Sequence, residues 1–184
     1  MSTCHTMKEA SLLIINSTEV LEEGFLLNLK NVYDEAMIAV FKRFNNLISV
    51  NLSKFTRGAS KSLALNCPKL LELDLTGFKE LTDNEMIMVS QKCTMLERVN
   101  VSFCDKLGDS SAIALMSKCK LKDIRMQKTM VTKSTVDFLI SNEIADLTYI
   151  NFFDCDIDET TMTYLSNYCK SHKIELKEKN EVYI

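Results

Sequence analysis

Cysteine and histidine are the side chains of this sequence that could bind a metal or form a nucleophile and its base. The chain contains seven cysteines and two histidines. Cys169 and His172 are separated by two residues, which is the spacing of half a zinc site. A zinc site needs about four ligands, and no second pair lies close by in the sequence. We therefore predict no metal site.

Thiol catalysis is disfavoured by the positions of the possible bases. A cysteine nucleophile needs a base beside its thiol, but His5 and His172 lie near the two ends of the chain. The four glycines do not cluster into a phosphate-binding loop, and G-x-S-x-G, H-E-x-x-H and G-K-[ST] motifs are absent. The sequence predicts a protein that is not an enzyme, with no cofactor and no small-molecule substrate.

The spacing of three cysteines instead indicates an internal repeat. Cys67, Cys93 and Cys119 recur at intervals of 26 residues, and CPKLLELDL at 67–75 matches CTMLERVNV at 93–101. Apolar residues at offsets 0, 3 and 5 continue the pattern in three further units: Leu47, Val50 and Leu52; Leu121, Ile124 and Met126; Leu147, Ile150 and Phe152. A repeat of this length is typical of a solenoid built from supersecondary units.

Each unit has the pattern of a strand, a turn and a helix. The last two apolar positions of the ladder have the two-residue period of a strand. An inward-facing residue is expected three positions later, at Phe55, Phe78, Cys104, Thr129 and Cys155. Helices are expected to start near Thr82, Gly108 and Asp158, and Thr82 and Glu85 have the spacing of a capping box.

These repeats resemble the cysteine-containing subclass of leucine-rich repeats, known from F-box substrate receptors of ubiquitin ligases and from related proteins without an F-box. The resemblance rests on Cys67, Cys93, Cys119 and the leucine ladder, and it covers about residues 45–176. It implies an α/β fold, a right-handed, ribonuclease-inhibitor-like horseshoe with about five to seven short repeats and a parallel sheet on its concave face. An F-box pattern is not recognisable in residues 1–45, and the chain has no tryptophan.

We expect one domain over residues 1–184. Residues 1–44 would form a degenerate first repeat that caps the solenoid, with a strand at 25–29 and a helix at 34–44. Residues 45–170 would hold the core repeats. Residues 171–184 would contribute a final strand at Ile174 and Leu176 and a tail.

The resemblance places the residues between the buried ladder positions on the concave face. Three columns are expected there: Ser49, Glu72, Arg98, Asp123 and Tyr149; Asn51, Asp74, Asn100, Arg125 and Asn151; Ser53, Thr76, Ser102, Gln127 and Phe153. The ten partner-binding candidates are the members of these columns from Glu72 onward, without Thr76 and Ser102. Arg98, Arg125, Tyr149 and Phe153 rank first, because arginine and aromatic side chains are frequent interface hot spots. For Phe153 the alternative is cover by the carboxy-terminal segment.

A basic stretch offers a second candidate surface. Its six basic residues share the segment with one acid, Asp123, and we call them the basic patch: Lys118, Lys120, Lys122, Arg125, Lys128 and Lys133. Such a patch can dock an acidic protein or a phosphate backbone. Charge runs on a solenoid are more often solvated surface, so nucleic acid is the less favoured partner.

Composition sets the broad class of the protein. A hydrophobic share of 46% with 26% charged residues fits a folded chain, and a net charge of -3 gives no global reason for binding nucleic acid or membrane. The odd cysteine number and the lack of signal-peptide and bilayer-length apolar patterns favour a cytoplasmic or nuclear protein.

Together these features predict a non-catalytic protein–protein interaction module, an adaptor or substrate-recognition protein, with a ubiquitin-ligase link implied by the resemblance. The alternative is a structural subunit of a large complex such as a ribonucleoprotein, docked through the basic patch at 118–133.

Overall fold

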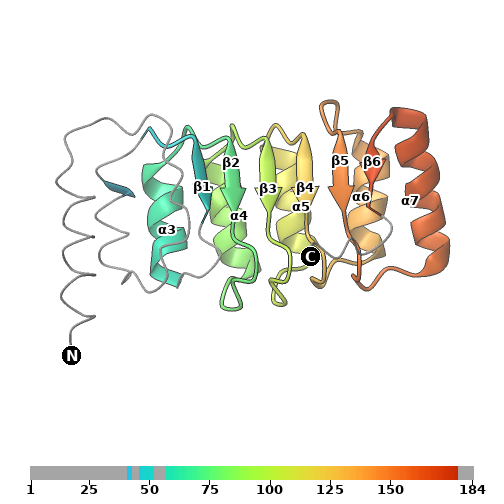
Figure 1. Cartoon of the computed structure of the whole chain (residues 1–184), viewed down its shortest axis with the longest axis horizontal. Helices are drawn as coiled ribbons and strands as arrows, with labels where there is room; N and C mark the ends of the chain where they lie inside the picture. The colour runs from blue at the N-terminus through green and yellow to red at the C-terminus, as the bar shows by residue number, and fades with distance from the viewer. Residues whose placement is uncertain (1–40, 43–45, 52–56, 178–184) are drawn as a thin grey trace, which may run out of the picture.

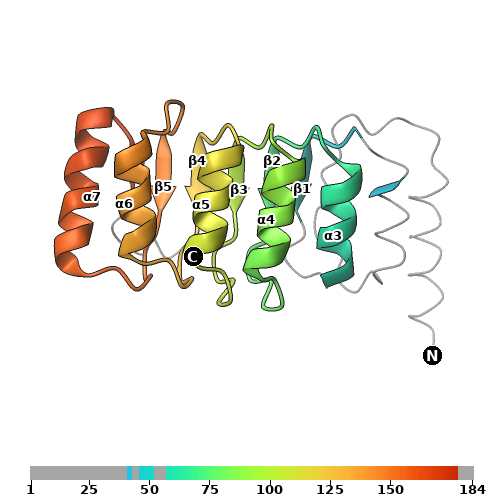
Figure 2. The ribbon, with the colours of Figure 1, turned by 180° about the vertical axis from the view of Figure 1, so that it is seen from behind.

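The fold is a row of alternating strands and helices. The computed structural model describes residues 41–42, 46–51 and 57–177, with backbone alone for 57–60. Within these residues six strands form one parallel sheet in chain order. Figures 1 and 2 show the sheet as one layer and helices α3–α7 as the other. The predicted α/β repeat architecture is confirmed.

The elements have nearly uniform lengths. The strands are β1 (Ser49–Asn51), β2 (Glu72–Asp74), β3 (Arg98–Asn100), β4 (Asp123–Arg125), β5 (Tyr149–Asn151) and β6 (Glu175–Leu176). The helices are α3 (Arg57–Asn66), α4 (Asp83–Lys92), α5 (Asp109–Lys118), α6 (Lys133–Asn142) and α7 (Glu159–His172). The final strand predicted at Ile174 and Leu176 is confirmed by β6. The strand predicted at 25–29, most of the helix predicted at 34–44, and Leu52, Ser53 and Phe55 lie outside the described residues.

The strand register aligns the repeats as the sequence pattern predicts. Ser49, Glu72, Arg98, Asp123 and Tyr149 are successive partners across the sheet, and Asn51, Asp74, Asn100, Arg125 and Asn151 form the neighbouring column. The central residue of each of strands β1–β4 is buried while its neighbours keep some exposure. The outer side of the sheet therefore displays the two columns, and we call it the sheet face.

The core lies between the sheet and the helices. Leu70, Leu96 and Leu121 are 0% exposed, and they occupy the same position in consecutive repeats. Burial of a leucine side chain contributes about 2 kcal/mol relative to exposure, but one repeat cannot cover its own apolar stripe. The stability of each unit therefore depends on its neighbours in the row.

A left-handed residue closes the turn after each of strands β2–β5. Gly77, Phe103, Lys128 and Asp154 occupy equivalent positions, with φ values of 73°, 63°, 55° and 59°. Only the first is glycine, the residue that adopts this conformation without steric cost. The turn directs the next inward residue into the core, where Phe78 and Cys104 are buried and Cys155 is half-buried.

The helices begin where the sequence predicts. Thr82, Gly108 and Asp158 are the N-cap residues of α4, α5 and α7. Glu85 Oε2 accepts hydrogen bonds from the backbone N–H and the hydroxyl of Thr82, both at 2.9 Å. None of the helices that the structure describes has the length and apolar character of a membrane span.

Candidate partner-binding surface

The first column of the sheet face contains an ion pair that spans two strands. Arg98 on β3 donates from Nε to Glu72 Oε1 on β2 at 2.9 Å, and its Nη2 contacts the same oxygen. Ser49 on β1 donates to Glu72 Oε2 at 3.1 Å. The hydrogen bond to Glu72 is the main cause that raises the pKa of Arg98. Three strands thus fix the position of one exposed guanidinium.

A second arginine is held in the next repeats. Arg125 on β4 donates from Nε to Asp123 Oδ1 at 2.9 Å and from Nη2 to Asp123 Oδ2 at 2.6 Å. Its guanidinium carbon lies 4.7 Å from the ring centre of Tyr149 on β5, within cation–π distance. Burial raises the pKa of Tyr149 and the charge of Arg125 opposes that rise. Arg125 and Tyr149 therefore form one ordered cluster.

The second column supports the turns that follow the strands. Asn100 Oδ1 accepts from the backbone N–H of Ser102 at 3.2 Å, and Asn151 Oδ1 accepts from that of Phe153 at 3.0 Å. Asp74 Oδ1 makes the same bond with Thr76 at 2.9 Å. A side-chain oxygen that accepts from the backbone N–H two residues later is the geometry of an Asx turn. This column shapes the fold as well as the surface.

The ten partner-binding candidates are not equally accessible. Asn151 is only 7% exposed, and its side-chain oxygen is used by Phe153. It therefore offers a partner little surface. Phe153 and Gln127 are half-buried, and the segment at 178–184 that could cover Phe153 lies outside the described residues.

The basic patch is divided between the two ends of strand β4. Lys118, Lys120 and Lys122 lie between the end of α5 and the start of β4, whereas Lys128 and Lys133 lie beyond the other end of β4. Arg125 lies between them on the sheet face. Segments that are adjacent in sequence are thus separated by the length of the strand, which the linear pattern did not reveal.

Most of the patch charge is also paired with acids. Lys122 contacts Glu97 at 2.9 Å, Lys128 contacts Asp154 at 3.9 Å and Lys133 contacts Asp137 at 2.8 Å. With Arg125 on Asp123, four of the six basic side chains have an acidic neighbour. The hydrogen bond from Lys122 is the main cause that lowers the pKa of Glu97.

The cysteines occupy packing positions. Cys93 donates its thiol to the carbonyl of Cys67 at 3.4 Å, and Cys104 donates to the carbonyl of Leu75 at 3.2 Å. Burial raises the pKa of Cys67 to about 12 and those of Cys93 and Cys104 to about 11. The thiolate is the nucleophilic form, so these thiols are poor nucleophiles at neutral pH.

The C-x-x-H pair at the end of α7 is split by burial. Cys169 is 1% exposed, while the exposed His172 ring stacks on Tyr168 with centroids 4.1 Å apart. Within the part of the chain that the structure describes, no group of three or more His, Cys, Asp and Glu side chains is placed to hold a metal ion.

Sequence reasoning missed one exposed aromatic at the edge of the sheet face. Phe103 is 38% exposed and occupies the left-handed turn position between Gly77 and Lys128 in the row of repeats. Its backbone N–H donates to the carbonyl of Gln127 at 2.7 Å. Alignment of its position with Gly77 could have identified it, because glycine at that site indicates a positive φ.

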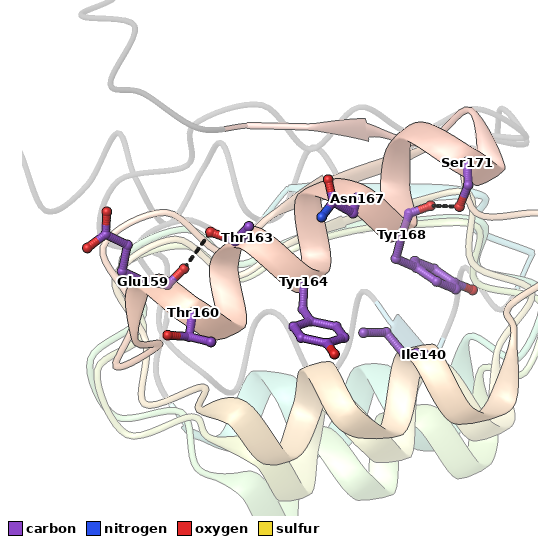
Figure 3. A pocket seen from close by; sticks show the side chains of 8 residues that line it. All are labelled: Ile140, Glu159, Thr160, Thr163, Tyr164, Asn167, Tyr168 and Ser171. Carbon is purple, nitrogen blue, oxygen red and sulfur yellow. Dashed lines mark hydrogen bonds between the residues drawn. The ribbon is translucent and has the colours of Figure 1, made fainter.

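A second missed feature is a groove in the helix layer. Figure 3 shows Tyr164 and Tyr168 of α7 pointing toward Ile140 of α6, in a groove of about 790 Å³. Tyr164 is 69% exposed. The repeat pattern marks the inward positions and the columns of the sheet, so it gave no signal for a groove between two helices.

Comparisons with known proteins agree with this geometry. Residues 92–116 match the family model described as "Leucine Rich repeat". The structure is similar to a chain in the crystal structure of the yeast Rad7 and Elc1 complex, with a TM-score of 0.63 and 20% sequence identity. The similarity covers 74% of this chain and 37% of that chain. This likeness supports the fold. The chain spans little more than a third of the length of the chain that it matches.

The 26-residue period, the single parallel sheet backed by helices, the match at 92–116 and the structural likeness lead to one conclusion. The chain is a leucine-rich-repeat protein.

Proposed function

We propose that this protein is a non-catalytic recognition module that binds a protein partner through the sheet face. The observation that carries the proposal is the pair of ordered arginines, Arg98 on Glu72 and Arg125 on Asp123 and Tyr149. Their positions are fixed by neighbouring repeats before any partner arrives. Binding therefore costs little side-chain ordering entropy.

The chemistry of the face suits a protein partner. Arginine and tyrosine are enriched among the residues that carry interface energy, and both are partly exposed here, with 48% of the Arg98 side chain and 43% of the Arg125 side chain accessible. Glu72, Asp74, Asn100, Asp123, Gln127 and Phe153 would surround them and provide polar complementarity.

The role that we propose is that of an adaptor or substrate-recognition protein. Rad7, a structural neighbour, was crystallised with a protein, Elc1, and the resemblance to F-box-type leucine-rich repeats points to ubiquitin ligases.

The ribonucleoprotein alternative has weaker support. Phosphate recognition gains from several lysines and arginines whose charges act together. The basic patch, however, is divided between the two ends of strand β4, and four of its side chains contact acids. We propose that the lysines of the basic patch are mainly solvent-exposed surface residues without a role in binding.

Affinity capture from cells tests the proposal. Tagged wild-type protein would be compared with Arg98→Ala, Tyr149→Ala and, as a matched control in the helix layer, Tyr164→Ala. We expect the two sheet-face variants to lose a defined set of proteins that wild type retains at both low and high salt, while the control retains it. Full retention by both sheet-face variants, or release of the partners by salt alone, would contradict the proposal.

A further inference from the structure

Asp74 differs from its equivalents in neighbouring repeats by carrying a negative charge. Its column contains Asn51, Asn100 and Asn151 at the equivalent positions on β1, β3 and β5. Asn100 and Asn151 form the same Asx turn as Asp74, each using an amide oxygen. An amide oxygen can therefore fill the same role as the carboxylate oxygen, and the turn does not require the charge of Asp74.

The recorded contacts of the Asp74 carboxylate come from neutral donors. Oδ1 accepts from the backbone N–H of Thr76 at 2.9 Å and from its hydroxyl at 2.6 Å, and Oδ2 accepts from Asn51 Nδ2 at 3.3 Å. Asp74 forms no ion pair with another residue that the structure describes. The two nearby arginines are instead held by Glu72 and Asp123.

Asp74 lines a shallow depression on the sheet face. The depression measures about 230 Å³ and extends over β1–β4, and its charged lining residues are Glu72, Asp74, Asp123, Arg98 and Arg125. Three carboxylates face two guanidiniums, so one negative charge is left over. Because Glu72 and Asp123 each have an arginine, the surplus charge belongs to Asp74.

The size of the depression limits what it can accept. Pockets for drug-sized ligands usually measure roughly 300–1,000 Å³, whereas this one is smaller and open to the sheet face. A single side chain of a protein partner fits such a site better than a small-molecule substrate does. A guanidinium or ammonium group would neutralise the charge of Asp74 and could also donate to its oxygens.

We propose that Asp74 receives a basic side chain, arginine or lysine, from the protein partner that docks on the sheet face. The inference rests on the proposed function and adds the chemistry of the partner to it. Asp74 is then a specificity-determining residue, because partners without a basic side chain at this point leave its charge unpaired.

Peptide binding tests the inference directly. The probe is a capped hexapeptide of alternating arginine and serine, titrated against the full chain by fluorescence anisotropy at low salt. Asp74→Asn keeps an oxygen that can accept from Thr76, and we expect it to bind the probe about threefold to fivefold more weakly than wild type, the effect of one partly exposed ion pair. Asp137→Asn, on α6 in the helix layer, removes the same charge and should bind like wild type.

Charge reversal gives an independent readout. The column already contains Arg125 on β4, so an arginine fits this position of the fold. We expect Asp74→Arg to lose the arginine peptide and to bind a peptide of alternating glutamate and serine, and we expect wild type not to bind that second peptide. Circular dichroism of each variant would verify that it is folded.

Three results would overturn the inference: no binding of the arginine peptide by wild type, equal weakening by Asp74→Asn and Asp137→Asn, or no change of preference in Asp74→Arg. The proposed function fails separately. If Arg98→Ala and Tyr149→Ala lose the cellular partners while Asp74→Asn keeps its affinity for the peptide, the sheet face is the interface and the role of Asp74 is refuted.

Discussion

Asp109 at the start of α5 accepts hydrogen bonds from both the backbone N–H and the hydroxyl of Thr132, the N-cap residue of α6, at 2.9 and 2.7 Å. Its Oδ1 also accepts from the hydroxyl of Thr135 at 2.5 Å. One carboxylate therefore joins two consecutive helix N-termini, where free N–H groups need acceptors. Asp83 makes a similar link to the backbone N–H of Gly108 at 2.9 Å.

Loss of this carboxylate should destabilise the solenoid. We expect Asp109→Ala to lower the free energy of unfolding by about 1–2 kcal/mol, the usual cost of losing a helix cap. The matched control is Asp105→Ala, which removes an exposed pair with Lys79 and should cost much less than Asp109→Ala. Urea unfolding followed by circular dichroism measures both variants. Equal losses of unfolding free energy in the two variants would show that the link between the helices does not stabilise the fold more than an exposed ion pair does.

Acid should remove the contribution of Asp109. Burial alone raises its pKa, but the hydrogen bonds from Thr135 and Thr132 outweigh burial and leave the pKa below its ordinary value. A carboxyl whose pKa is lower in the folded state stabilises the fold above the unfolded-state pKa of about 3.9, and that stability is lost as the pH falls through the folded-state pKa.

The stability difference between wild type and Asp109→Asn should therefore be constant from pH 7 to pH 5 and shrink below about pH 4. Urea midpoints of both proteins across this range measure it. A difference that grows on acidification would show that the pKa shift has the opposite sign.

The buried thiols should be nearly inert in the folded protein. Since burial raises the pKa of Cys93 to about 11, its thiolate fraction at pH 8 should be roughly 100-fold lower than in the unfolded chain. We expect iodoacetamide to modify Cys67, Cys93 and Cys104 slowly in buffer and rapidly in urea, as measured by mass spectrometry of peptides. Rapid alkylation of Cys93 in buffer would indicate that the repeat opens.

The strand and helix positions could be predicted from sequence because they depend on short-range patterns. Leu73 and Leu75 alternate with the polar residues Glu72 and Asp74, and Thr82 precedes Glu85 at the capping spacing. The same apolar spacing recurs in successive repeats, so a boundary that is ambiguous in one repeat can be placed by alignment with the next. The register of the sheet follows from this alignment.

The details of the surface depend on contacts between repeats, which a linear pattern does not contain. Asn151 has the same pattern as Asn100, but it is only 7% exposed while Asn100 is half-buried. Lys122 and Lys128 are close in sequence, yet the strand β4 separates them and each meets a different acid. The alignment of the repeats places Arg98 beside Glu72, but it does not show that the two side chains form an ion pair.

Phe103 provides a test of backbone strain at the turn position. Its φ of 63° lies in the left-handed region, where a residue with a Cβ costs roughly 1–2 kcal/mol relative to the usual conformation. Glycine avoids this cost, as the equivalent Gly77 with φ of 73° does. We therefore expect Phe103→Gly to be more stable than Phe103→Ala by about 1 kcal/mol, although glycine has the larger conformational entropy in the unfolded chain. Both variants remove the partly exposed ring, so the difference in their stability isolates the backbone contribution.

Gly77→Ala should also destabilise the fold, since nothing lies within 4 Å of the added Cβ and only the backbone conformation opposes the substitution. Urea unfolding measures all three, and an alanine variant at 103 as stable as the glycine variant would show that the turn carries no strain.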